Sequence, residues 1–164
     1  MNSENQKFGA PPSSKEDLAR AFFHQGANCS QSVAMAFAEE CGMTSETMAR
    51  IASGFGAGMG RMREVCGAVS GMVLVANLLW GCGDVACKEG KDSQYARVQE
   101  LANRFRSETG SIICRELLGL EKKQDAAPVS EERTPTYYQK RPCIEMVALA
   151  ARILEDYLKK TEKI

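Results

Sequence analysis

Histidine is nearly absent from the sequence, since His24 is the single one among 164 residues. Metal sites built from several imidazole ligands are therefore excluded. A catalytic pair of His24 with Cys29 stays open, although the sequence offers no third group to orient the imidazole. Because His24 lies close to Gly26, near the end of a predicted helix, we expect it on the surface.

The chain also lacks net charge, because 21 Lys and Arg residues balance 21 Asp and Glu residues. No basic field points to nucleic acid or to an anionic membrane as a partner. The first residues lack the basic segment and apolar run of a secretory signal, so we expect a cytoplasmic protein. One charge-free run, residues 65–83, raises the question of a membrane span, but Ser70, Asn77 and its glycines favour a buried helix.

Alternating strand patterns are missing as well, whereas several segments carry apolar residues at helical spacing. A length of 164 residues fits one domain. We therefore expect an all-α protein, a compact single-domain bundle of six or seven helices. The helical domain is expected over residues 14–160, after a flexible N-terminal lead-in at residues 1–13.

The expected helix boundaries follow from capping residues and glycines. The first helix should begin at a capping box of Ser13 and Glu16 and end near Gln25. The others are expected from the Asn28 cap to Gly42, from Thr44 or Ser45 to about Gly54, over residues 62–80, from Asp92 or Ser93 to Gly110, after Ser111, and from Pro142 to about Lys159. Loops are expected at residues 81–90 and 121–136, the second of them mobile.

Cysteine is abundant instead, and its odd total of seven leaves at least one thiol outside any internal pair. In a reducing compartment such residues serve metals, catalysis or redox exchange more often than structural bridges. Four of them fall in or near the first turns of four predicted helices, where unpaired N–H groups and the helix dipole favour a thiolate. Each also follows its helix's apolar face, so the four sulfur atoms are expected to converge in the core: Cys29, Cys66, Cys114 and Cys143.

Converging thiolates are the ligands that hold zinc or an iron–sulfur cluster. The three other cysteines have weaker patterns. Cys41 is expected at a helix C-terminus, where the dipole disfavours an anion. Cys82 and Cys87, spaced C-x4-C in a predicted loop, could chelate a metal or form a local disulfide.

The stretch GFGAGMGRMREVCGAVSG, residues 54–71, combines many glycines with Cys66. Glycine costs about 0.5–1 kcal/mol relative to alanine in regular structure, so we expect close approach to Cys66 as the reason. Gly67 and Gly71 lie four apart and give one helix a flat face that another backbone can approach. The glycine N–H groups are candidates to cradle an anionic sulfur or cofactor, from Gly56, Gly58, Gly60 and Gly67. Simple helix packing after a flexible loop, with no ligand, is the alternative.

The same stretch is not a phosphate loop, since it lacks the G-K-[ST] ending and follows no strand. Arg61, Arg63 and Glu64 beside it are expected to form a solvated charged turn. Steering of an electron-transfer partner is their alternative role.

Four segments carry a resemblance to a known family: GANCSQSV at residues 26–33, CGAVSG at 66–71, CRELLG from Cys114, and RPCIEMVALAA up to Ala151. Over about residues 20–155 the chain resembles the redox-active proteins named for a C_GCAxxG_C_C pattern. The resemblance implies a helical domain, a redox role and a redox partner protein, such as an oxidoreductase. Its four cysteines fall on Cys29, Cys66, Cys114 and Cys143.

A similar four-cysteine region occurs in split-Soret cytochromes, where an iron–sulfur cluster has been proposed. The resemblance therefore implies such a cluster here. The haem does not carry over, because the chain has no C-x-x-C-H motif.

Three functions stay open at this point. The first is an electron-transfer protein with a metal centre, preferably iron–sulfur, on the four family cysteines. The second is a metal-free thiol–disulfide protein in which Cys66 is the attacking thiolate. The third is a non-enzymatic module with structural zinc. Whether the protein is an enzyme stays undecided.

Overall fold

The computed structural model describes residues 12–120 and 127–162. Its helices are α1 (Lys15–His24), α2 (Cys29–Ala36), α3 (Ser45–Ala52), α5 (Gly67–Trp80), α6 (Lys88–Thr109), α7 (Cys114–Leu117), α8 (Pro135–Lys140) and α9 (Cys143–Thr161). A 3-10 turn, η1 (Ser53–Phe55), and a turn labelled α4 (Gly56–Met59) connect α3 to α5. Within the described ranges the fold is all-α, as predicted, but it has eight right-handed helices rather than six or seven.

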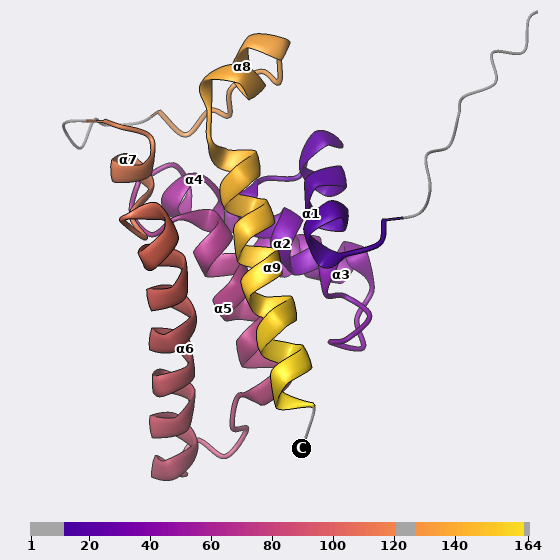
Figure 1. Cartoon of the computed structure of the whole chain (residues 1–164), viewed down its shortest axis with the longest axis vertical. Coiled ribbons are helices and arrows are strands. Elements are labelled where there is room, and N and C mark those ends of the chain that lie inside the picture. The colour runs from indigo at the N-terminus through magenta and orange to yellow at the C-terminus, as the bar shows by residue number, and fades with distance from the viewer. Residues whose placement is uncertain (1–11, 121–126, 163–164) are drawn as a thin grey trace, which may run out of the picture.

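The core lies where α1, α2, α5 and α9 pack together, with α6 against α5 and α9 and with α3 against α2 (Figure 1). Its largest fully buried side chains come from α1, α3, α5, α6, α9 and the C-cap of α2: Phe23, Phe37, Met48, Met72, Phe105, Leu101 and Leu154. The approach of α5 to α2 is close, since a Cβ atom on Gly71 would lie 2.7 Å from the Ser30 carbonyl oxygen. The flat glycine face predicted on this helix is therefore confirmed.

Figure 1 also shows that α4, α7, α8 and the start of α9 gather at one end of the bundle. The loop between α5 and α6 lies at the opposite end. Among the described helices none is long and apolar enough to cross a membrane. Residues 67–80 instead form α5, half of whose residues are buried in the core.

Several predicted boundaries are wrong by a few residues because another group acts as the cap. Ser14 rather than Ser13 caps α1, since its hydroxyl accepts a hydrogen bond from the Asp17 N–H at 3.1 Å. The sulfur of Cys87 accepts from the Gly90 N–H at 3.3 Å, so α6 begins before Asp92. The predicted Asn28 and Thr44 caps are confirmed.

Three larger corrections concern α2, α5 and α8. α2 ends at Ala36, well before Gly42. The long helix predicted from Met62 begins only at Gly67, because left-handed backbone precedes it. α8 lies partly in the segment 121–136 predicted as a loop, where Thr134 accepts from the Tyr137 N–H and Pro135 begins the helix. Residues 1–11 of the predicted lead-in and residues 121–126 of that loop lie outside the described residues.

Candidate functional site

The glycine-rich connection between α3 and α5 forms a left-handed turn. From Ala57 to Arg61 five consecutive residues have φ between +55° and +73°, and Arg63 has φ +59°. Non-glycine residues pay about 1–2 kcal/mol each for this conformation, so such runs persist only where surrounding contacts hold them. The glycines at 58 and 60 thus reduce the strain of a turn whose other members are Ala57, Met59 and Arg61.

Gly58 is required for space as well as for conformation. A Cβ atom there would lie 2.7 Å from the Cβ of Cys114 and 2.7 Å from the Cα of Arg63. On Gly67 it would lie 3.0 Å from the Cβ of Cys29. The missing side chains therefore admit Cys114 and Cys29, whereas the sequence had suggested close approach to Cys66.

The other two glycines proposed as a cradle have different surroundings. Gly56 is buried, and a Cβ atom there would meet the Asn28 side chain at 2.4 Å. Gly60 is exposed, and the nearest atom to its Cβ position is 3.9 Å away. Contact between these glycines and a cofactor stays a prediction.

Cys66 and Cys114 are brought together by a short antiparallel pairing. Cys66 N–H donates to the Ile112 carbonyl at 2.8 Å, and Cys114 N–H donates to the Glu64 carbonyl at 2.6 Å. Between these bonds, Val65 and Ile113 form an isolated bridge. The pairing fixes Cys66 as the residue before α5 and Cys114 as the first residue of α7.

Cys29 and Cys143 meet from two other helices. Each is the first residue of its helix, Cys29 after the capping Asn28 of α2 and Cys143 after Pro142 of α9. Each thiol shifts the pKa of the other, chiefly through a side-chain hydrogen bond between them. The structure thus joins two residues far apart in the chain, both at helix N-termini.

All four family cysteines line a single cavity of about 40 Å³. The convergence predicted from their helix starts is therefore present, while their roles as ligands or nucleophiles stay predictions. The cavity is far smaller than the roughly 300 Å³ needed by an organic cofactor. The described residues hold no group of three or more Cys, His, Asp or Glu side chains arranged to bind a metal ion. All seven cysteines are free thiols.

Burial opposes ionisation of most of these thiols. It raises the pKa of Cys66 to about 12, although the N–H groups of Ala68 and Val69 partly offset it. Burial also raises the pKa of Cys114, although the nearby Arg63 guanidinium partly offsets this increase. Lowered pKa values were expected at all four helix starts, so for Cys66 and Cys114 desolvation outweighs the helix dipole.

The thiols of Cys29 and Cys143 differ in pKa. The hydrogen bond from Cys29 lowers the pKa of Cys143 to about 7, helped by the positive charges of Arg141 and Arg63 and opposed by burial. The same hydrogen bond and burial raise the pKa of Cys29 well above the ordinary value. Cys143 is therefore the thiolate of the pair, and Cys29 keeps the proton.

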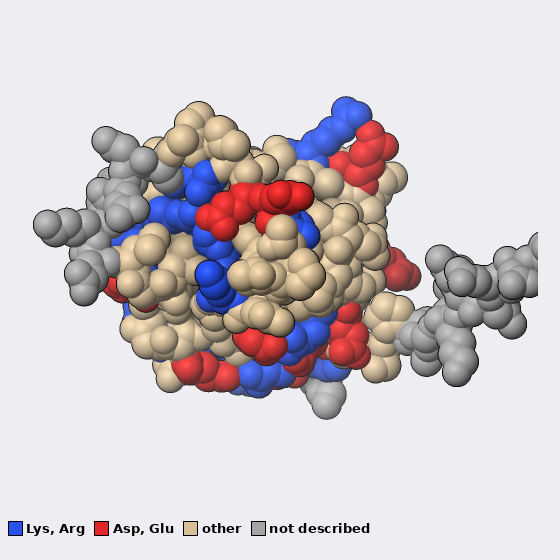
Figure 2. All heavy atoms as spheres, turned by 90° about the horizontal axis from the view of Figure 1, so that it is seen from above, with Lys and Arg blue, Asp and Glu red and all other residues tan. Residues whose placement is uncertain are grey.

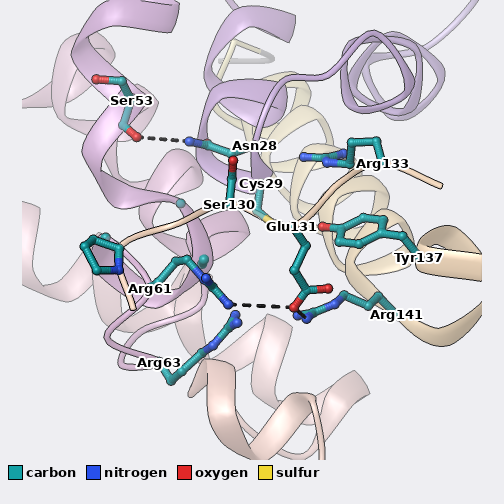
Figure 3. Close-up of a pocket in the computed structure, with 14 residues that line it drawn as sticks. Asn28, Cys29, Ser53, Arg61, Arg63, Ser130, Glu131, Arg133, Tyr137 and Arg141 are labelled. Atoms are coloured by element: carbon teal, nitrogen blue, oxygen red, sulfur yellow. Dashed lines mark hydrogen bonds and ion pairs between the residues drawn. The ribbon is translucent and has the colours of Figure 1, made fainter. Parts of the chain in front are cut away.

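An arginine-lined pocket of about 380 Å³ lies beside this cavity. Figure 3 shows Arg61, Arg63 and Arg141 pointing toward Glu131, with Arg133 above the Tyr137 ring. The side chains that line both spaces include Cys29, Arg63, Tyr137 and Arg141. Figure 2 looks down on this end of the molecule, where blue Lys and Arg atoms gather next to red Asp and Glu atoms.

The expectation of a solvated charged turn is wrong for Arg63. It is 7% exposed, and its Nη1 atom lies 3.9 Å from the Cys114 sulfur. Sequence reasoning missed Arg133, Tyr137 and Arg141, because they lie in or directly after a polar stretch, residues 121–136, predicted as a mobile connection. The T-P pair at residues 134–135, a cap followed by proline at the first helical position, was the available signal for α8.

The remaining cysteines lie away from the cavity. Cys41 follows the end of α2 in a turn, and burial raises its pKa. Cys82 and Cys87 flank Gly90 at the far end of α5, where a Cβ atom on Gly90 would lie 2.8 Å and 3.2 Å from their sulfur atoms. His24 is exposed, as expected, and its ring is 5.1 Å from that of Tyr138.

Comparison with known proteins identifies a family. Residues 27–157 match the family described as "Putative redox-active protein (C_GCAxxG_C_C)". No curated protein and no solved structure matches the chain. The match spans most of the chain and includes all four cysteines of the cavity, so the protein belongs to the C_GCAxxG_C_C family of redox-active proteins.

Proposed function

We propose that the protein is a thiol–disulfide redox protein whose working pair is Cys29 and Cys143. The observation that carries the proposal is the convergence of these two thiols, from the starts of α2 and α9, in one cavity where each shifts the pKa of the other. Both are half-buried, whereas Cys66 and Cys114 are only 5% and 7% exposed. A reactive dithiol needs adjacent sulfur atoms, an accessible thiolate and a second thiol that resolves the intermediate.

The reduced pair would transfer two electrons to a disulfide. The Cys143 thiolate attacks one sulfur of the substrate, forms a mixed disulfide and releases the other half as a thiolate. Cys29 then attacks the Cys143 sulfur, closes the Cys29–Cys143 disulfide and releases the second half. The Cys29 proton goes to one departing thiolate and the other takes a proton from water, so the substrate becomes two thiols.

Cys143 replaces Cys66 as the attacking thiol in this proposal. A pKa near 7 leaves a large thiolate fraction at neutral pH and keeps the nucleophilicity that a much lower value would reduce. Arg141 and Arg63 supply positive charge beside that sulfur. A redox partner, an oxidoreductase among the candidates, would reduce the disulfide again.

The test is a redox titration of the full chain in thiol–disulfide buffers between about −300 and −120 mV. We expect a single two-electron transition, with mass spectrometry locating the disulfide between Cys29 and Cys143. Cys29→Ser should accumulate a mixed disulfide on Cys143, and Cys143→Ser should form none. Cys82→Ser, an exposed thiol at the other end of the bundle, is the matched control and should titrate like the parent protein. Absence of any oxidised pair over this range would overturn the proposal.

A metal or iron–sulfur centre is the second candidate, because Cys29, Cys66, Cys114 and Cys143 line one cavity. Tetrathiolate sites hold zinc or iron. The described residues as placed do not form such a site, so this candidate requires the sulfur atoms to close in on binding. A structural zinc on these cysteines would require the same movement of the sulfur atoms.

Metal analysis separates the candidates. The protein is purified without oxygen, assayed for iron, sulfide and zinc, and assayed again after cluster reconstitution. Visible absorption with stoichiometric iron and sulfide, lost in Cys66→Ser and Cys114→Ser, would favour the cluster. One tightly held zinc whose removal unfolds the chain would favour the structural role. A metal-free, fully folded protein with an oxidisable Cys29–Cys143 pair is the expected result.

A further inference from the structure

The pocket beside the thiol pair has a strong excess of positive charge. Four arginines line it, and Glu131 is the only acidic side chain among its described lining residues. The chain as a whole has no net charge, so this excess is local. A concave site lined by guanidinium groups is suited to carboxylates, which arginine binds through paired hydrogen bonds.

The four arginines do not have the same role. The Arg133 guanidinium donates to the carbonyls of Phe23 and Ala27 at 3.2 Å and 3.1 Å, and lies 4.4 Å from the centre of the Phe23 ring. These contacts anchor the segment before α8 to the end of α1. Arg61, Arg63 and Arg141 are the three that point toward the middle of the pocket (Figure 3).

Glu131 shows how this site accepts a carboxylate. Its Oε1 atom is hydrogen-bonded by Arg141, and the same oxygen lies 3.7 Å from an Nη atom of Arg61. The Glu131 side chain is 45% exposed, and it belongs to the non-helical segment before α8. One carboxylate balances only one of the three guanidinium charges that converge there, and water can reach it.

The arginine pocket and the thiol cavity share lining residues. Cys29 lines the arginine pocket, while Arg63 and Arg141 also line the cavity that contains Cys143. A carboxylate held by these arginines would therefore place the rest of its molecule next to the thiol pair. The volume of about 380 Å³ suits a small molecule rather than a folded partner.

We propose that this pocket binds a small disulfide bearing carboxylate groups, which is the oxidant of the Cys29–Cys143 pair. The inference rests on the proposed function and adds the substrate class. Arg61, Arg63 and Arg141 hold a carboxylate of the disulfide, and its sulfur atoms meet Cys143. Exchange follows the two steps given above, so the substrate leaves as two carboxylate-bearing thiols.

The experiment compares three disulfides of different charge on the reduced full-length protein. They are 3,3′-dithiodipropionate, which is dianionic, bis(2-hydroxyethyl) disulfide, which is neutral, and cystamine, which is dicationic. We expect the dianion to oxidise the pair about tenfold or more faster than the neutral disulfide, and cystamine to be slowest. The rate ratio is the readout, because it cancels changes in the nucleophilicity of Cys143.

Substitutions in the pocket then test whether its arginines cause the preference for the dianionic disulfide. Arg61→Gln and Arg141→Gln should each reduce the dianion-to-neutral ratio severalfold, and Glu131→Gln should raise it by removing the competing carboxylate. Arg50→Gln is the matched control, since Arg50 is exposed on α3 and pairs with Glu46. Circular dichroism confirms that each variant is folded. Equal rates for all three disulfides, or a preference unchanged in both pocket variants, would overturn the inference.

A ligand without sulfur separates this inference from the proposed function. Suberate has two carboxylates at a similar spacing and cannot exchange with a thiol. We expect calorimetry to detect its binding to the parent protein and a loss of at least severalfold in affinity in Arg141→Gln. Suberate binding without oxidation by any disulfide would overturn the redox proposal and the substrate assignment together. Oxidation without charge preference or suberate binding would overturn the pocket inference alone.

Discussion

The Nη1 atom of Arg63 lies 3.9 Å from the sulfur of Cys114, inside the wall shared by the thiol cavity and the arginine pocket. Arg63 reaches this position from a backbone with φ +59°, at the end of the left-handed turn. The buried cation opposes the desolvation that raises the pKa values of two of the four thiols, Cys114 and Cys143. The strained turn therefore has an electrostatic consequence, because it places this guanidinium where the sulfur atoms converge.

Replacing Arg63 should raise the pKa of both thiols that its charge stabilises as anions, Cys114 and Cys143. In Arg63→Gln we expect alkylation of Cys143 by iodoacetamide at pH 7 to slow by about 2- to 5-fold, corresponding to a shift of about half to one pKa unit from a value of about 7. Arg63→Lys keeps the charge and should retain more of the rate. Site-resolved mass spectrometry gives the rates, and Arg50→Gln serves as the control. An unchanged rate in Arg63→Gln would show that this charge does not govern the thiolate.

The helix starts of the site were predictable from local sequence, whereas the charge around it was not. Asn28 followed three residues later by Gln31 forms the capping box that begins α2, and Pro142 precedes α9. These local signals placed Cys29 and Cys143 at helix N-termini. Cys66 and Cys114 were placed less well, because their positions depend on the pairing of residues 64–66 with 112–114, which no local pattern specifies.

The left-handed turn shows why the rest escaped prediction. The glycines at 58 and 60 indicate that the backbone can adopt positive φ there. The non-glycine residues Ala57, Met59 and Arg61 also have positive φ, which their side chains disfavour. The Glu64 N–H bond to the Gly58 carbonyl at 2.9 Å closes the turn, and a tertiary bond from the Cys114 N–H to the Glu64 carbonyl at 2.6 Å holds its end in place. The burial of Arg63 and the unequal pKa values of the thiols depend on this geometry, so they became visible only in the folded chain.

Gly58 and Gly60 form a matched pair for testing the turn. Both have positive φ, but only Gly58 lacks room for a Cβ atom, which would lie 2.7 Å from Cys114. We expect Gly58→Ala to lower the free energy of unfolding by about 2–5 kcal/mol, from backbone strain and overpacking together. Gly60→Ala should lower it by only about 1 kcal/mol, from the backbone alone. Urea denaturation measures both, and equal losses would contradict the close contact with Cys114.

The opposite change should relieve strain at Met59. This residue is 42% exposed and has φ +66°, so glycine removes a penalty of about 1–2 kcal/mol, which offsets the chain entropy and the partial burial that the change costs. We expect Met59→Gly to leave the free energy of unfolding unchanged or raised by up to about 1 kcal/mol. Met62 is 53% exposed without positive φ, and Met62→Gly should lower it by about 0.5–1 kcal/mol. Equal destabilisation of the two variants would argue against a left-handed residue 59.

The pH dependence of Cys143 tests the thiol pair itself. Its pKa of about 7 is lowered chiefly by the hydrogen bond from Cys29, so its alkylation rate should rise as the pH increases through 7 and level off about two units above. In Cys29→Ala the hydrogen bond is lost and the pKa of Cys143 should rise, which moves the profile to higher pH and slows the reaction at neutral pH. Cys66, with a pKa of about 12, should stay nearly unreactive throughout this range. A Cys143 profile that is the same in both proteins would mean that Cys29 does not stabilise the thiolate, and the assignment of attacking and resolving thiols would then fail.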